Sequence, residues 1–124
     1  MVIYQSRLFI KPVPYKVRTT VINGTPTVYT PEYYKHYKQL LAYYVSSEYQ
    51  HQQWFRVYSL QLIFNLATEH YTSKNAGDLD NLSKGVLDAL QGIIWKNDAQ
   101  IIQMDVSKYP AIENSIYICA EGFN

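Results

Sequence analysis

The sequence predicts an α+β, or mixed α/β, fold in which a small β-sheet carries two main helices. Its 124 residues, 48% of them hydrophobic, are enough for one domain with one core, spanning residues 1–124. Several short stretches alternate apolar and polar residues as strands do, and two longer stretches repeat apolar residues at helical spacing. The expected order of elements is therefore β-β-β-α-β-α-β-β, with the helices packed on the sheet.

Strands are expected at both ends and in the middle of the chain. Residues 2–10 form the first strand, which the prolines that follow bring to an end. Asn23-Gly24 favours a type I′ turn, so the residues on either side, 19–22 and 25–29, should pair as a hairpin. The alternation in residues 56–66 predicts a half-buried central strand. The last two strands are expected at the following positions: residues 99–106 and 114–120, joined by a turn over 107–110.

Two helices are expected. Thr30-Pro31-Glu32 combines an N-cap, a proline and an acid in the first turn, so a helix should begin there and run to about Ser47. Its expected core stripe consists of Tyr33, Tyr37, Leu40, Leu41 and Tyr44. The second helix should span residues 79–90 and end at Gly92. Its expected apolar face consists of Leu79, Leu82, Val86, Leu90 and Ile93.

Charge is divided unevenly along the chain. Residues 1–74 carry eight basic and three acidic side chains, a net charge of +5, whereas residues 75–124 carry three basic and seven acidic ones, a net charge of −4. This division suits a protein that grips a polyanion with one region and holds a metal ion with the other, although solvated surface charge explains the basic half nearly as well. The single cysteine, Cys119, excludes an internal disulfide and a cysteine zinc site, and the start lacks a signal peptide. The expected compartment is the cytoplasm.

The acidic residues gather around the start of the second helix. Asp78 and Asp80 flank one leucine there, Lys84 follows one helical turn later, and Asp98 returns after the helix has ended. Carboxylates this close repel one another, and a divalent cation with oxygen ligands would relieve the repulsion. Mg²⁺ is held in this way by carboxylates together with phosphate oxygens of a substrate, so the cluster predicts an acidic metal site for phosphodiester chemistry.

Simpler interpretations of each residue stay open. One makes Asp78 an ordinary N-cap, and another has Lys84 bridge Asp80 and Asp88 in exposed pairs one turn apart. A calcium-binding loop does not fit, because its sixth position would be Ser83 rather than glycine and its twelfth Ala89 rather than glutamate. Acid–base catalysis without a metal would leave the lysine and the basic half unused.

Three ordered motifs resemble the RusA family of Holliday junction resolvases, which are common in phages and prophages. These motifs are Asp78-Leu79-Asp80-Asn81-Leu82-x-Lys84, Leu87-Asp88-Ala89-Leu90 and Trp95-x-Asn97-Asp98-Ala99-Gln100-Ile101. A weaker resemblance, in Lys11-Pro12-x-Pro14 and Tyr29-Thr30-Pro31, extends it over essentially the whole chain.

This resemblance implies a homodimeric, Mg²⁺-dependent endodeoxyribonuclease, with Mn²⁺ a possible substitute, that cuts four-way DNA junctions by paired nicks in recombination and repair. Asp78, Asp80 and Asp98 match the family's metal-binding aspartates, Lys84 its catalytic lysine, and Asp88 a recurrent acid of open role. The sequence departs from the family at two positions. Gly77 stands where a basic residue is often found, and Asn97 replaces the first residue of an Asp-Asp pair.

On this hypothesis a C₂ dimer would present one complete site in each chain to the two symmetry-related strands of a junction. The candidates for gripping the DNA arms are Lys11, Lys16, Arg18, Lys35 and Lys38. Two alternatives remain at this point. One is a non-catalytic junction-binding protein on the same fold, and the other is a metal-dependent nuclease for other branched DNA or ordinary duplex.

Overall fold

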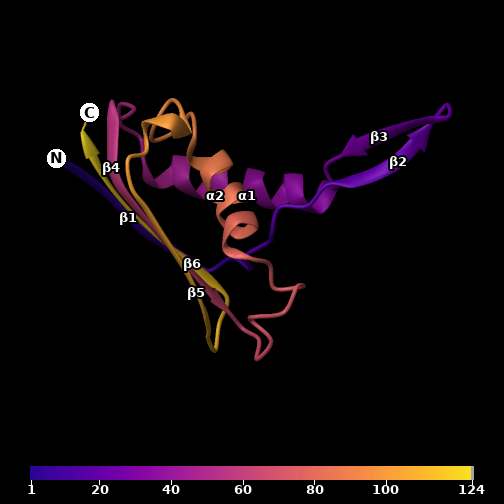
Figure 1. The fold of residues 1–124 in the computed structure, drawn as a ribbon. Coiled ribbons are helices and arrows are strands. Elements are labelled where there is room, and N and C mark those ends of the chain that lie inside the picture. The colour runs from indigo at the N-terminus through magenta and orange to yellow at the C-terminus, as the bar shows by residue number, and fades with distance from the viewer. Residues whose placement is uncertain (124) are drawn as a thin grey trace.

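A four-stranded β-sheet with both helices on one of its faces makes up the body of the protein (Figure 1). The computed structural model describes residues 1–123. The sheet consists of β1 (Val2–Leu8), β4 (Arg56–Leu66), β5 (Met104–Pro110) and β6 (Ser115–Phe123). The helices are α1 (Glu32–Glu48) and α2 (Leu79–Leu90), and β2 (Arg18–Ile22) and β3 (Thr25–Tyr29) form a separate two-stranded ribbon. This arrangement confirms the predicted α+β class.

The sheet has the strand order β1-β6-β4-β5. β6 runs antiparallel to both β1 and β4, whereas β5 runs parallel to β4. A parallel pair needs a long crossover connection, and α2 lies within the segment that joins β4 to β5. β4 has neighbours on both sides, so its predicted central place is confirmed.

The core lies between the helices and the covered face of the sheet. Wholly buried side chains of β4 and β6, such as Leu62 and Ile118, face those of α2, such as Val86. Trp54 and Trp95 are buried in the same core. Leu82 and Leu90 of the predicted apolar face are also buried, whereas Leu79, at its start, is exposed. None of the helices in residues 1–123 is long and apolar enough to cross a membrane.

The predicted core stripe of α1 is only partly right: Tyr37 and Leu41 are buried as predicted, whereas the residues at its two ends are not. The buried residues are Tyr34, Tyr37, Leu41 and Val45, whereas Tyr33 and Tyr44 are exposed. Tyrosines occupy adjacent positions at both ends of this helix, and composition alone could not show that one of the first pair is buried while both of the second pair are exposed. Tyr33 lies instead beneath the Arg18 guanidinium, whose carbon is 5.9 Å from the centre of its ring.

The predicted bounds of three strands also need correction. The last strand runs from Ser115 to Phe123 rather than over residues 114–120. The first strand ends at Leu8, two residues earlier than expected. Residues 98–100 form a short 3₁₀ helix, η1 (Asp98–Gln100), and the following strand runs from Met104 to Pro110. The turn expected over residues 107–110 is therefore strand, paired in register with β4, and residues 111–114 make the connection. A terminal proline is compatible with this strand because β5 is at the edge of the sheet.

Candidate functional site

α2 begins at Asp78, and this start organises the site. One carboxylate oxygen of Asp78 accepts a hydrogen bond of 3.0 Å from the backbone N–H of Asn81, so Asp78 is an N-cap. A carboxylate has a second oxygen, which this cap does not use. Asp80 lies in the first turn, where the helix dipole favours a negative charge, and its side chain is exposed.

Residues 10–16 pack against the turn that precedes α2. Gly77 has a φ of +88°, and a Cβ there would lie 2.6 Å from Cβ of Pro14, so only glycine fits. The Tyr15 N–H donates a hydrogen bond of 2.7 Å to the carbonyl of Asn81. These contacts explain why no basic side chain stands at position 77.

Lys108 holds the same turn from the sheet side. Its Nζ donates a hydrogen bond of 2.7 Å to the carbonyl oxygen of Gly77. The side chain comes from β5, where Lys108 pairs with Phe64 of β4 and is half-buried. The position of Asp78 is thus fixed from two sides, by residues 10–16 and by β5.

Asp88 and Lys84 of α2 each contact a side chain from outside that helix. Lys38 of α1 pairs with Asp88 at 3.5 Å, and its Nζ lies 5.2 Å from the centre of the Tyr34 ring. The Nζ of Lys84 lies 5.1 Å from the centre of the Tyr15 ring. Among residues 1–123 Lys84 makes no salt bridge, so it does not bridge the aspartates one turn before and after it. Asp88 is held by α1 instead.

Asp98 is fixed by its neighbours in the loop after α2. Its Oδ1 accepts a hydrogen bond of 2.8 Å from the indole N–H of Trp95, and its backbone N–H donates to the side chain of Gln91 at 2.8 Å. Burial raises the pKa of the Asp98 carboxyl, and the negative charge of Asp88 raises it further. The Trp95 hydrogen bond and the positive charge of Lys84 act on that pKa in the opposite direction.

Asn97 has a structural role here. Its side chain accepts a hydrogen bond of 2.8 Å from the Ala99 N–H, while the Gln100 side chain accepts one of 2.8 Å from the Asn97 N–H. This reciprocal capping box holds η1, and Gln100 also donates to the carbonyls of Trp54 and Phe55. An asparagine at position 97 therefore locks the loop that carries Asp98.

The predicted site residues are only partly brought together. Asp88 and Lys84 both lie close enough to act on the pKa of the Asp98 carboxyl, whereas Asp78 and Asp80 lie at the start of α2. Within residues 1–123, no three carboxylate, imidazole or thiol side chains form a group that could hold one metal ion. Asp78, Asp80 and Asp98 therefore form no ready-made three-carboxylate cage within these residues, and their role as metal ligands stays a prediction.

The donor chemistry nevertheless suits Mg²⁺. This ion prefers oxygen ligands and is commonly held by one or two carboxylates, with substrate phosphate oxygens and waters completing the set. A preformed cage of three carboxylates is thus not required. Asp78 and Asp80 are suitable ligands at one end of α2, and Asp98, a poorly solvated carboxylate beside another acid, would gain most from a nearby cation.

A basic cleft of about 860 Å³ opens beside the start of α2 and is lined in part by Asp78. Four lysines line it: Lys11, Lys16, Lys74 and Lys108. Lys11 and Lys16 were predicted, and Arg18 stacks on Tyr33, which is also part of the lining. Lys35 and Lys38 do not line the cleft but pair with Glu32 and Asp88.

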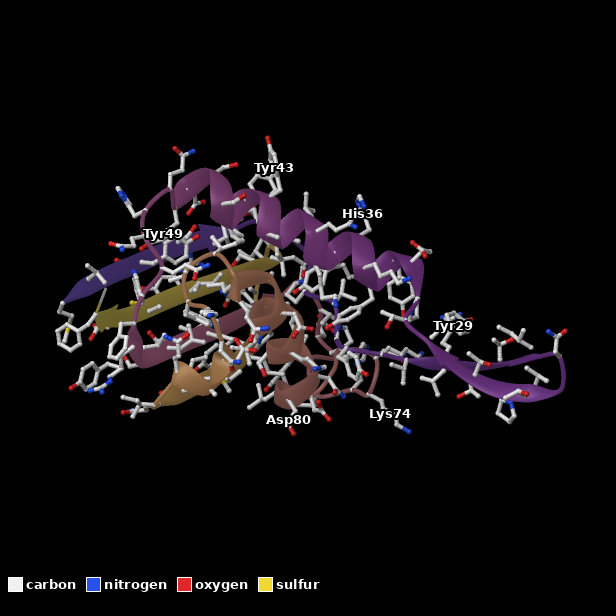
Figure 2. The ribbon with its side chains drawn as sticks, turned by 90° about the horizontal axis from the view of Figure 1, so that it is seen from above. Tyr29, His36, Tyr43, Tyr49, Lys74 and Asp80 are labelled. Atoms are coloured by element: carbon white, nitrogen blue, oxygen red, sulfur yellow. The ribbon has the colours of Figure 1, made fainter. Side chains whose placement is uncertain are left out.

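Sequence reasoning missed Lys74 and Lys108. Lys74 stands just before the acidic motif, and that proximity was a usable signal. Figure 2 shows Lys74 and Asp80 on the same side of the molecule, away from the face of α1 that carries His36 and Tyr43. No local sequence pattern marks Lys108 as a residue of the cleft, because its position depends on the pairing of β5 with β4.

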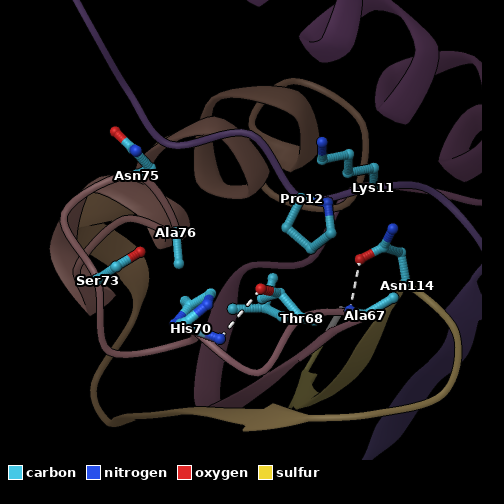
Figure 3. Close-up of a pocket in the computed structure, with 10 residues that line it drawn as sticks. Lys11, Pro12, Ala67, Thr68, His70, Ser73, Asn75, Ala76 and Asn114 are labelled. Carbon is cyan, nitrogen blue, oxygen red and sulfur yellow. Dashed lines mark hydrogen bonds between the residues drawn. The ribbon is translucent and has the colours of Figure 1, made fainter.

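A second hollow, of about 430 Å³, adjoins the cleft and shares Lys11, Pro12, Ser73 and Asn75 with it (Figure 3). Its other polar lining comes from Thr68, His70 and Asn114. Asn114 accepts a hydrogen bond of 2.9 Å from the Ala67 N–H, and Thr68 accepts one of 3.1 Å from the His70 N–H. The cleft and this hollow together form a longer polar groove.

The family comparison covers the same elements. The family model described as Endodeoxyribonuclease RusA matches residues 10–120, a stretch that contains the cleft lysines, α2 and Asp98. A search of the curated proteins found no match.

The hydrogen bond from Lys108 to Gly77 generates a first prediction. Lys108→Met keeps the apolar stem and removes the charged donor, so the turn before α2 should open more often. We expect faster amide hydrogen exchange in residues 74–78, with an unfolding free energy lower by about 1–2 kcal/mol. Lys96→Met, at an exposed lysine, is the matched control and should change neither quantity. Equal exchange in both variants would remove Lys108 as a support of the turn.

Proposed function

The chain belongs to the Endodeoxyribonuclease RusA family, and we propose that it is a metal-dependent enzyme that resolves four-way DNA junctions by paired nicks. That family acts on Holliday junction DNA. The observation that carries the proposal is the basic cleft that leads to the capped acidic start of α2. DNA bound in the cleft would there meet the carboxylates that are proposed to hold the metal ion.

The cleft lysines are proposed to bind the sugar-phosphate backbone. Lys11, Lys16 and Lys74 supply positive charge without hydrogen-bond geometry that would select one base over another. Such contacts give affinity that depends on salt and little on sequence. This fits an enzyme that recognises the shape of a junction.

The acidic residues are proposed to hold Mg²⁺, with Mn²⁺ as a substitute, through Asp78, Asp80 and Asp98. When bound, the ion would lower the pKa of a water molecule and neutralise charge on the scissile phosphate. Lys84 is proposed to stabilise the negative charge that develops on the phosphate oxygens. Asp88 would act through Lys38, whose ammonium it holds next to α2.

A non-catalytic junction-binding protein is the main alternative. Exposed carboxylates at the edge of a DNA cleft repel phosphate and would weaken simple binding. Their retention together with Lys84 therefore favours hydrolysis. A metal-dependent nuclease for other branched DNA would use the same cleft, and a panel of substrates distinguishes it.

Asp80→Asn tests the catalytic proposal, because it removes one negative charge at nearly constant shape. Loss of an outer-shell partner of a metal costs about 10–100-fold, so loss of a ligand should lower the cleavage rate by at least about 100-fold. The assay follows nicking of a synthetic four-way junction in Mg²⁺, beside a matched linear duplex, a flap and EDTA. Asp105→Asn, at an exposed aspartate that pairs with Gln61 on the uncovered face of the sheet, should cleave normally.

Three outcomes of this assay speak against the proposal. Cleavage by Asp80→Asn at the normal rate removes Asp80 from the site. Junction binding without cleavage by the unmodified protein favours the non-catalytic alternative. Equal cleavage of the flap and the junction favours the nuclease for other branched DNA.

Salt dependence tests the DNA surface. Each phosphate contact contributes about −0.9 to the slope of log affinity against log salt, so Lys16→Gln with Arg18→Gln should flatten that slope by about 2. Arg7→Gln with Arg56→Gln is the matched control, since these arginines stack on Tyr117 and Phe55 and do not line the cleft. A slope that the first pair leaves unchanged places the DNA elsewhere.

We also propose a two-fold dimer, because a four-way junction has two equivalent strands to cut and a C₂ dimer presents two equivalent sites. Mixing unmodified chains with Asp80→Asn chains tests this. We expect mixed dimers to nick one strand and to leave the opposite strand intact. Mixed dimers that nick neither strand would show that each site takes ligands from both chains, and a monomeric mass on junction DNA would end the dimer proposal.

A further inference from the structure

The β2–β3 ribbon projects from the body of the protein beyond the N-terminal end of α1 (Figure 1). Asn23 and Gly24 form its tip with φ values of 51° and 78°, as the predicted type I′ turn requires. Every residue from 18 to 29 is exposed except Thr27, which is half-buried. The strands pair only with each other.

An isolated two-stranded ribbon is marginally stable in water. At least three strands, or a helix packed on one face, are normally needed. In residues 1–123 neither face of this ribbon is covered by another element. A ribbon of this kind gains most from a surface that it can lie against.

The two faces of the ribbon differ chemically. The pairing register places Arg18 opposite Tyr29 and Thr20 opposite Thr27, so these side chains share one face. We call this the hydroxyl face; it also includes Ile22 and Thr25. The other face carries Thr19, Val21, Pro26 and Val28.

The positive charge of the ribbon and of the segment before it indicates the kind of surface that the hydroxyl face fits. Residues 10–31 contain no acidic side chain and carry three basic ones, Lys11, Lys16 and Arg18. Hydroxyl groups can donate to phosphates and to base edges alike, and threonine methyl groups can contact the methyl group of thymine. The face therefore complements a nucleic acid.

The ribbon also continues the basic cleft. Lys16 and Tyr33 line that cleft, and Arg18 at the base of the ribbon lies over Tyr33. Figure 2 shows Asp80, Lys74 and then Tyr29 along one side of the molecule. DNA that leaves the cleft towards α1 would next meet the ribbon.

We propose that the β2–β3 ribbon is an arm that enters the major groove of one duplex arm of the bound DNA, with its hydroxyl face towards the bases. The major groove, about 12 Å wide, admits a two-stranded ribbon. Five residues at about 3.3 Å each span roughly 17 Å, or half a turn of B-DNA. This inference rests on the proposed function and adds a second contact surface to it.

A second copy of this chain is the competing occupant, because Val21 and Val28 are 66% and 64% exposed. The charge of this part of the chain decides between DNA and a second copy. A two-fold contact brings the same patch of both chains together. Residues 10–31 carry three basic side chains and no acidic one, so two copies of this patch would place like charges side by side. A contact with DNA accounts both for the basic side chains and for the absence of acidic ones.

Chemical footprinting tests the proposal on the intact ribbon. Asp80→Asn chains are bound to a four-way junction with guanines along every arm, and dimethyl sulfate then probes guanine N7, which faces the major groove. We expect protection over about five base pairs of a duplex arm. In the same background, Thr20→Glu should weaken binding at least tenfold and abolish that protection, whereas Gln50→Glu, at an exposed residue beyond the other end of α1, should change neither.

Each other result overturns the inference. Full N7 reactivity on all arms of a formed complex excludes the major groove. Unchanged affinity and protection with Thr20→Glu excludes the hydroxyl face. A lower oligomeric mass with Val21→Ser, measured without DNA, identifies a second copy as the occupant. Cleavage by the otherwise unmodified protein, assayed in parallel, shows whether the proposed function stands when this inference fails.

Discussion

The contact between residues 10–16 and the turn before α2 is the constraint on which the site depends. It joins the basic half of the chain to the acidic half, and it leaves so little room at Gly77 that a Cβ would overlap Pro14. The Lys108 ammonium adds a hydrogen bond to this turn, and the Tyr15 N–H adds one to the first turn of α2 that follows it. Without this contact Lys11 and Lys16 would not line a cleft together with Asp78.

The charged groups of the site contribute little to the stability of the fold and are held in place by other interactions. Lys38 and Asp88 are each about one third exposed, and pairs of that kind contribute about 0–1 kcal/mol. Burial and a neighbouring acid both disfavour the ionised form of Asp98, so the capping box and the Trp95 hydrogen bond are needed to hold it in place. The stability that permits this arrangement comes from the apolar core, where Trp95 is itself wholly buried.

The parts of the site that could be predicted from the sequence are those set by local interactions. Capping by Asp78, the turn at Asn23-Gly24 and the apolar spacing of α2 depend on neighbours within a few residues. The buried face of α1 could be predicted only at Tyr37 and Leu41, since tyrosines stand on either side of the boundary between core and solvent. The place of Lys108 depends on a parallel strand pairing across more than 40 positions of the chain, which no local pattern records.

The cleft and the ribbon differ in how firmly they are held, and this difference suits the recognition of a branched substrate. Hydrogen bonds and close packing fix the cleft, whereas the base of the ribbon is held to α1 by the stacking of Arg18 on Tyr33, a cation–π interaction of about 0.5–1 kcal/mol at an exposed site. That energy is close to RT, so the ribbon can change its angle to the body at little cost. A rigid cleft keeps the phosphate aligned with the acidic residues, while an adjustable arm follows a duplex whose direction depends on the geometry of the junction.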